Sequence, residues 1–162
     1  MRYILILSLF LSIPLSATAQ DVPLGCYARD YSDEHLAKRT EQVVDRLSIR
    51  FSKSGERTTA EVKVLLADQG HAGRAGYGGR QASEVADNYA APLRFNVECD
   101  GGGFDVVKSD SNGILIETDW FRLSGNRNEC SGGDLRSNLH EEGSSSTRYR
   151  LEQAEAAACD WE

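Results

Sequence analysis

The chain has 162 residues, with 18 Lys and Arg against 25 Asp and Glu, and a formal net charge of −7. This acidic balance argues against non-specific binding to nucleic acids or anionic membranes, both of which need a basic surface. It is compatible with a basic partner, although solubility alone explains the same charge. The length indicates one domain that is large enough to bury its own apolar core.

The first 19 residues have the pattern of a cleavable secretory signal. A basic start at Arg2 precedes the apolar run 3–15, and a small-x-small pattern of the kind that signal peptidase requires ends at Ala19. The apolar run is too short to span a membrane, and no longer one follows it. We therefore predict a signal peptide at 1–19, a single domain at 20–162, and a periplasmic or extracellular location.

Alternation of apolar and polar residues predicts strands early in the domain. A weak pattern covers 22–28, and a clear one covers 44–51. After a glycine-containing turn at 53–56, the alternation resumes at 59–66, with its apolar residues on one face. Two such segments joined by a short turn indicate a β-hairpin.

A second group of alternating segments begins at Leu93. Two tight turns that contain glycine separate three predicted strands, and neighbours joined in this way form a meander. These strands are expected at 93–99, 104–108 and 114–123, and a further strand is expected at 147–151.

Helical patterns are short and lack the apolar stripe of a core helix. They cover 32–38, where Ser32 or Asp33 would cap the helix, then 83–88 and the alanine-rich stretch 152–159. Seven or eight strands with antiparallel neighbours predict an all-β fold, and we expect a small antiparallel meander barrel with short peripheral helices. A β-sandwich is the alternative, because strand count and alternation do not separate the two.

Four cysteines in an exported chain predict two disulfides, for which three connectivities are possible. In a meander, the strands that end at Cys99 and near residue 123 finish at the same end of the barrel, so we expect Cys99 to pair with Cys130. Cys26 and Cys159 would then join the two ends of the domain. The chain has no C-x-x-C spacing, which disfavours a metal site, and we expect no cofactor.

The segment 70–80 is the candidate ligand-binding site. It contains five glycines, which disfavour a strand, together with side chains that can grip a carboxylate, a phosphate or a sugar. It lacks the Gly-rich fingerprints of nucleotide sites, and a simple connection between two halves of the sheet is the alternative. The candidate ligand-binding residues are His71, Arg74, Tyr77 and Arg80.

No residue pattern indicates catalysis. Glu117 and Asp119 have the spacing of two carboxylates on one strand face, but a solvated strand explains them better than a glycosidase pair. Asp110 and Asn112 begin like a calcium-binding loop, yet the later ligands of such a loop are missing, so we expect a turn. Because no activated nucleophile, metal cluster or cofactor motif stands out, we expect that the chain is not an enzyme.

Four stretches carry a resemblance: GCYARDY at 25–31, VLLADQGHAGR at 64–74, VECDGGGF at 97–104 and AAACDWE at 156–162. In these stretches the chain resembles uncharacterised small exported proteins of alphaproteobacteria, and this resemblance implies no activity. The size, export signal and disulfide-bearing β architecture are also similar to those of periplasmic lysozyme inhibitors, although the inhibitor loop motifs are absent.

These observations predict a secreted or periplasmic binding protein that recognises a protein or a small anionic ligand through the glycine-rich segment, without catalysis. One alternative is an envelope structural or stress protein with no discrete ligand. Another is a lysozyme-inhibitor-like protein, whose basic target would suit the acidic charge. We expect neither a nucleic-acid partner nor a membrane span, and the oligomeric state stays open.

Overall fold

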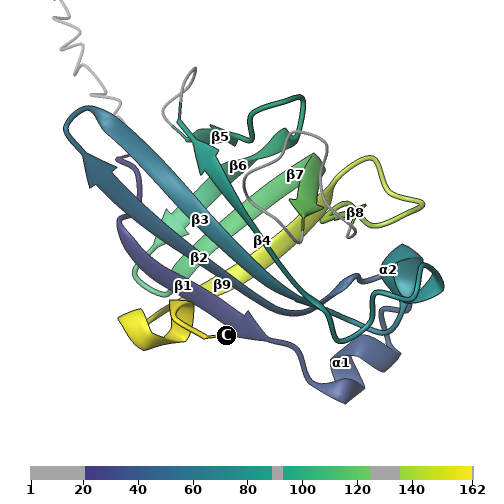
Figure 1. Cartoon of the computed structure of the whole chain (residues 1–162). Coiled ribbons are helices and arrows are strands. Elements are labelled where there is room, and N and C mark those ends of the chain that lie inside the picture. The colour runs from purple at the N-terminus through teal and green to yellow at the C-terminus, as the bar shows by residue number, and fades with distance from the viewer. Residues whose placement is uncertain (1–20, 89–92, 125–135, 162) are drawn as a thin grey trace, which may run out of the picture.

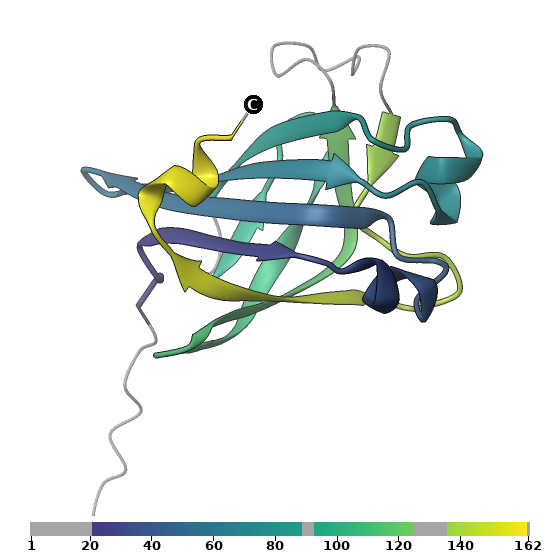
Figure 2. The same ribbon diagram turned by 90° about the horizontal axis from the view of Figure 1, so that it is seen from below.

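The structure, a computed structural model, describes residues 21–88, 93–124 and 136–161. These residues form nine antiparallel strands, most of which curve around one interior, and three short helical segments that lie outside it (Figures 1 and 2). The strands are β1 (Gly25–Asp30), β2 (Val44–Ser54), β3 (Arg57–Leu66), β4 (Gln81–Asp87), β5 (Arg94–Asn96), β6 (Gly102–Asp110), β7 (Gly113–Ser124), β8 (Arg136–Asn138) and β9 (Thr147–Ala154). The helices are α1 (Asp33–Ala37), α2 (Gly70–Arg74) and the 3₁₀ turn η1 (Ala156–Cys159).

Eight of the nine strands close into a barrel. The order is β6-β5-β4-β3-β2-β1-β9-β7-β8, and an additional pairing of β6 with β7 closes the ring. Strand β8 lies outside this ring and pairs with the end of β7 through three residues. The predicted antiparallel barrel is therefore confirmed over the sandwich, and the outer strand β8 is an addition that the sequence did not predict.

The predicted hairpin at 44–66 is confirmed as strands β2 and β3. Their register pairs Ile49 with Val62 and Phe51 with Ala60, and all four side chains are buried. The predicted helix at 32–38 is confirmed as α1, and the Ser32 hydroxyl accepts a hydrogen bond from a backbone amide of its first turn.

Three sequence-based assignments of secondary structure were wrong. The segment predicted as a helix at 83–88 belongs to β4, because pairing with β3 outweighs its weak helical pattern. The strand predicted at 93–99 is reduced to β5, because Cys99 and Asp100 have φ values of 60° and 55° that end the extended backbone. In the stretch predicted as a C-terminal helix, β9 continues to Ala154 and only η1 is helical.

Aromatic rings fill the interior of the barrel. The Phe95 ring stacks on that of Phe104 with a centroid distance of 5.3 Å, and Phe51 lies 5.0 Å from Phe95 in an edge-to-face arrangement. Phe121 packs against Phe104 at 5.6 Å. An eight-stranded barrel is just wide enough to be filled by side chains, and these packed rings leave the barrel ends and the outer surface as places for a ligand.

The predicted disulfide between Cys26 and Cys159 is confirmed, and it joins β1 to η1. The predicted partner of Cys99, Cys130, lies outside the described residues, so that pairing stays a prediction. The predicted signal peptide at 1–19 also lies outside them. Across the described ranges, no helix has both the length and the apolar character needed to cross a membrane.

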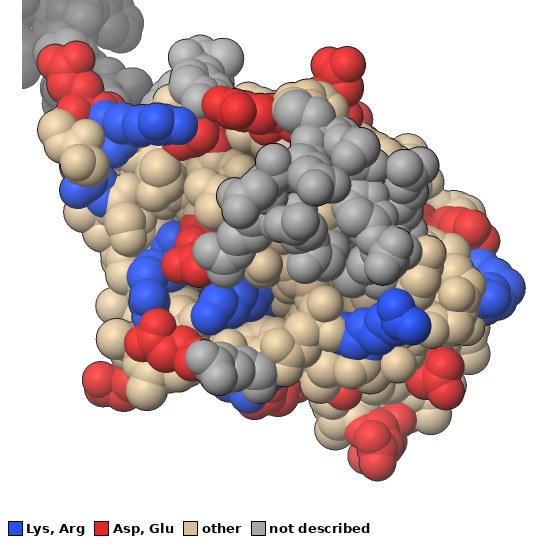
Figure 3. Space-filling view, in the orientation of Figure 1, with Lys and Arg blue, Asp and Glu red and all other residues tan. Residues whose placement is uncertain are grey.

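Basic and acidic side chains are interspersed on the surface. Figure 3 shows small groups of both signs on the face presented in Figure 1. On a chain of net charge −7, an anionic ligand would therefore be bound by local arrangement of charges rather than by a broad basic field.

Candidate functional site

The glycine-rich segment 70–80 is a tightly packed connection between β3 and β4. A Cβ atom at Gly73 would lie 2.6 Å from the Asp68 carbonyl carbon, and one at Gly78 would lie 2.7 Å from the Asp68 Cα. At Gly70, which has a φ of +58°, a Cβ would lie 2.7 Å from the Glu41 carbonyl oxygen. Glycine is thus needed here for close approach of backbones, a structural role that the composition alone did not distinguish from ligand binding.

Within this segment, Arg74 is held by two carboxylates. Its guanidinium pairs with Glu41 at 3.3 Å and also with Glu142. The Arg80 guanidinium lies over the Tyr77 ring, 5.6 Å from its centroid, and the Tyr77 side chain packs partly buried against the core.

The fourth predicted residue, His71, contacts a neighbouring segment. Its Nε2 lies 3.1 Å from the carbonyl oxygen of His140. Because a carbonyl oxygen only accepts, His71 donates through Nε2. The structure therefore places the four predicted residues on one connection and engages each of them in contacts within the protein.

A second region, between β1 and β9, is more open. These strands pair over only three residues, Cys26–Ala28 with Glu152–Ala154. Beyond them β1 pairs with β2 alone, and the start of β9 pairs with β7 alone. A groove of about 430 Å³ lies where the two strands separate, and we call it the seam groove. It is lined by Arg29, Tyr31, His35, Arg39, Gln42, Leu115, Glu141, Ser144, Ser146, Thr147, Arg148 and Arg150.

Two of the four arginines in the seam groove have carboxylate partners. Arg148 pairs with Glu117, and Arg150 pairs with Asp110, both at 3.0 Å. The hydrogen bond from Arg150, a backbone hydrogen bond from Asn112 and one from Lys108 hold the pKa of the Asp110 carboxyl well below its usual range. Both of these arginines are therefore held in place by acidic neighbours.

The other two, Arg29 and Arg39, make no ion pair within the described ranges. Arg29 reaches across the groove, where its Nη1 lies 3.5 Å from the Arg150 carbonyl oxygen and its guanidinium stands 5.1 Å from the centre of the Tyr31 ring. Arg39 follows α1 and is exposed. Two arginines thus line one groove with no carboxylate partner among the residues that the structure describes.

One wall of the seam groove is built from Tyr31, His35 and Gln42. The Tyr31 and His35 rings lie 4.9 Å apart, and His35 Nε2 lies 3.0 Å from Gln42 Oε1. Gln42 also donates from its amide to the Val44 carbonyl oxygen at 2.8 Å, which fixes the orientation of that amide. Burial raises the pKa of Tyr31 to about 12, so its phenol stays neutral at ordinary pH.

Glu141 contributes a half-buried carboxyl to another wall of the seam groove. Burial raises its pKa, while the nearby Arg39, Tyr149, His140 and His35 act in the opposite direction. No ion pair to this carboxyl occurs in the part of the chain that the structure describes. The Glu141 backbone amide donates to the Thr147 hydroxyl at 2.7 Å, which anchors the segment.

The glycine-rich segment supports this wall from behind. His71 donates to the His140 carbonyl, and Arg74 pairs with Glu142, so the two residues that flank Glu141 are both held by the connection between β3 and β4. Figure 1 shows α1, α2 and the turn that leads into β9 at the same end of the barrel. Two of the four predicted ligand-binding residues therefore contact the back of the seam groove.

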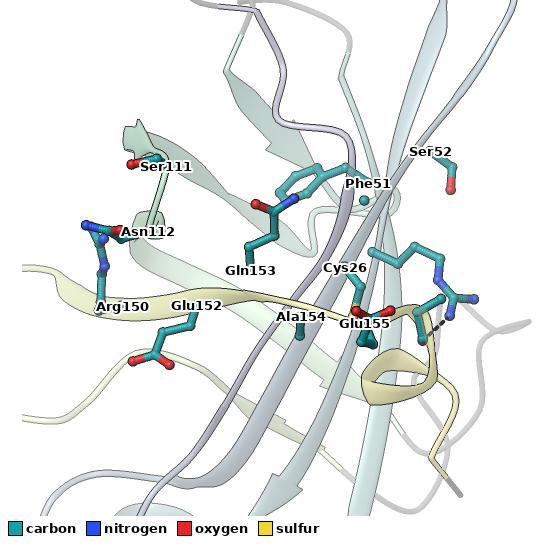
Figure 4. A pocket seen from close by; sticks show the side chains of 13 residues that line it. Cys26, Phe51, Ser52, Ser111, Asn112, Arg150, Glu152, Gln153, Ala154 and Glu155 are labelled. Carbon is teal, nitrogen blue, oxygen red and sulfur yellow. Dashed lines mark hydrogen bonds between the residues drawn. The ribbon is translucent and has the colours of Figure 1, made fainter.

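A larger groove, of about 1030 Å³, lies beside the disulfide (Figure 4). Its arginines are already paired: Arg50 with Asp160 at 2.6 Å, and Arg150, seen beside Asn112 in Figure 4, with Asp110. Glu152 and Glu155 add negative charge to it. This groove is therefore less suited to an anion than the seam groove.

Two of the carboxylates noted in the sequence, Glu117 and Asp110, have partners in the structure. Glu117 accepts hydrogen bonds from the Ser146 hydroxyl at 2.5 Å and from Arg148 at 3.0 Å. The Asp110 carboxylate accepts from the Asn112 backbone amide at 2.9 Å, which is the turn that the sequence predicts. Among the described residues, no group of three or more His, Cys, Asp or Glu side chains could hold a metal ion.

Sequence reasoning did not find the seam groove, because its lining comes from β1, the α1 region, β7, β9 and the segment before β9. Arg29 and Tyr31 lie in the GCYARDY stretch, which was the one local signal near it. In comparisons with known proteins, no family model, no curated protein and no solved structure matches this chain.

Proposed function

We propose that the chain is a secreted or periplasmic, non-catalytic binding protein that holds a small anionic ligand in the seam groove. The observation that carries the proposal is that Arg29 and Arg39 line this groove without an ion pair in the described residues. A guanidinium presents a planar fork of donors that matches a carboxylate or a phosphate. An anionic ligand would supply the partner that both side chains lack.

The size and setting of the groove support a small ligand. Its volume of about 430 Å³ falls within the roughly 300–1,000 Å³ that is typical of small-molecule sites. The Cys26–Cys159 disulfide supports the proposed location outside the cytoplasm, because disulfides form and persist in oxidising compartments.

Binding is favoured over catalysis by the partners of the groove's histidine. His35 is hydrogen-bonded to the amide of Gln42, which is not a nucleophile, so no base–nucleophile pair is formed there. The glycine-rich segment is the less favourable anion site, because a ligand at Arg74 would have to displace Glu41 and Glu142.

Isothermal titration of the purified protein with phosphate, acetate and citrate tests this proposal. We expect the double substitution Arg29→Ala and Arg39→Ala to weaken the tightest of these interactions by about tenfold or more, which corresponds to the loss of charge-assisted hydrogen bonds. The matched double substitution Arg74→Ala and Arg80→Ala should change it by less than about twofold, since those guanidiniums lie outside the groove.

Two outcomes would contradict the proposal. A larger loss in the Arg74/Arg80 variant would place the anion on the glycine-rich segment. If the wild-type protein binds none of the three anions, an envelope structural role without a discrete ligand becomes the better account.

A further inference from the structure

The seam groove presents charges of both signs. Arg29 and Arg39 offer guanidiniums, and Glu141 offers a half-buried carboxyl, and none of the three makes an ion pair within the described residues. The positive charge of Arg39 acts to lower the pKa of the Glu141 carboxyl, yet the two side chains form no ion pair within the described residues. As far as the described residues go, the groove therefore has an acceptor as well as donors that form no ion pair.

A simple anion would satisfy only half of this arrangement. It would bind the two arginines but would be repelled by the ionised form of Glu141, which lines the same groove. A ligand with an ammonium group at one end and a carboxylate at the other would give each charged side chain an opposite partner.

Resting on the function proposed above, we infer that the ligand is a zwitterion, an amino acid or short peptide with free amino and carboxyl ends. Its carboxylate accepts hydrogen bonds from Arg29 and Arg39, and its ammonium donates to Glu141.

The other lining groups fit such a ligand. Tyr31 and Leu115 provide apolar surface for an aliphatic portion, and the Ser144 hydroxyl adds a polar contact on the Glu141 side. The groups that surround the Glu141 carboxyl come from α1, the residues on either side of it, the segment between β8 and β9, and β9 itself: His35, Tyr31, Arg39, His140 and Tyr149. Among these, Tyr149 and Tyr31 stay neutral, because burial raises the pKa of both phenols.

Three forms of one dipeptide test the inference: L-alanyl-L-alanine, its N-acetyl derivative and its C-terminal amide, each titrated at up to millimolar concentration. We expect acetylation, which removes the ammonium, to weaken binding about tenfold or more, and amidation, which removes the carboxylate, to do the same. In a Glu141→Gln variant, the free and the acetylated peptide should bind alike. The matched variant Glu142→Gln, whose carboxylate pairs with Arg74 instead, should still discriminate between them.

The failure of this inference is distinguishable from that of the proposed function. Equal binding of the free and acetylated peptides, or no binding of any form, would overturn the inference that the ligand is a zwitterion. If phosphate, acetate or citrate still binds in an Arg29- and Arg39-dependent manner, the anion site stands. If no anion binds either, both proposals fall.

Discussion

The glycine-rich segment 70–80 and the seam groove differ in where their charged groups find partners. The segment gathers His71, Arg74, Tyr77 and Arg80 within eleven residues, and it is the most conspicuous local pattern in the sequence. In the structure, however, Arg74 binds two carboxylates, Arg80 lies on Tyr77 and His71 donates to a backbone carbonyl. The lining of the seam groove is scattered along the chain, yet it contains two arginines, Arg29 and Arg39, that make no ion pair within the described residues.

The cause of the difference is packing. Glycines at 70, 73 and 78 let the segment lie directly against Glu41 and Asp68, which brings its polar groups within reach of neighbours. At the seam, β1 and β9 separate after three paired residues, and two arginines of the groove there, Arg29 and Arg39, make no ion pair in the described part of the chain. A cluster of binding-competent residue types in sequence is therefore weaker evidence for a ligand site than a break in strand pairing.

Removing the disulfide should have the largest effect on the free energy of unfolding, and it should loosen the region where β1 and β9 meet. The double substitution Cys26→Ser and Cys159→Ser opens a link between residues 133 apart in sequence, and we expect the free energy of unfolding to fall by about 2–5 kcal/mol. Chemical denaturation measures this loss. Hydrogen exchange should increase at 25–31 more than at 70–80, and a larger increase at 70–80 would contradict the proposed difference between the two regions.

Two glycine substitutions test whether the segment 70–80 is a packed structural element. Both Gly70 and Gly76 have positive φ, but only at Gly70 would a Cβ meet other atoms within 4 Å. We expect Gly70→Ala to lower the free energy of unfolding by about 2–4 kcal/mol and Gly76→Ala by about 1 kcal/mol. Equal losses in denaturant titrations would show that the close approach to Glu41 is unimportant.

Single arginine substitutions compare the two regions directly. Arg74→Ala removes two surface ion pairs and should lower the free energy of unfolding by up to about 1 kcal/mol, less at high salt. Arg39→Ala removes no ion pair in the described residues and should change it by less than about 0.5 kcal/mol. Thermal denaturation at low and high salt measures both, and a salt-sensitive loss at Arg39 would mean that it has an internal partner.

The smallest expected effect is a change in how the free energy of unfolding depends on pH. Because the folded protein raises the pKa of Glu141 above its ordinary value of 4.5, the protonated carboxyl favours the folded state. That contribution is complete below the unfolded pKa and is lost as pH rises through the folded pKa. Glu141→Gln should therefore become more stable relative to wild type as pH rises from 4 toward 7, by denaturant titration. A parallel pH profile would show that the carboxyl is fully solvated.

The sequence predicted the parts of the fold that depend on local alternation. Strands β2, β3, β6, β7 and β9 follow apolar residues spaced by two, and the Cys26–Cys159 pairing follows from a barrel whose ends meet. It was wrong for 83–88, where Glu84 and Ala86 are buried in a strand that pairs with β3. That pairing depends on a neighbour and leaves little trace in the segment itself.

The candidate site was less accessible to sequence reasoning. Arg29, Arg39 and Glu141 come together only when the barrel closes, and no spacing in the chain connects them. His71 and Arg74 were predicted from the residue types of the glycine-rich segment. In the structure they contact the two residues that flank Glu141. Residue types were readable from the sequence, whereas the partners of those residues required the fold.

The most direct test of the account follows the arginine Nε–Hε resonances by ¹H–¹⁵N NMR during titration with the tightest-binding of phosphate, acetate and citrate. The account predicts that the Arg29 and Arg39 signals shift in a saturable manner while those of Arg74 and Arg80 stay in place. Saturable shifts at Arg74 and Arg80, with Arg29 and Arg39 unchanged, would contradict it and return the ligand site to the glycine-rich segment.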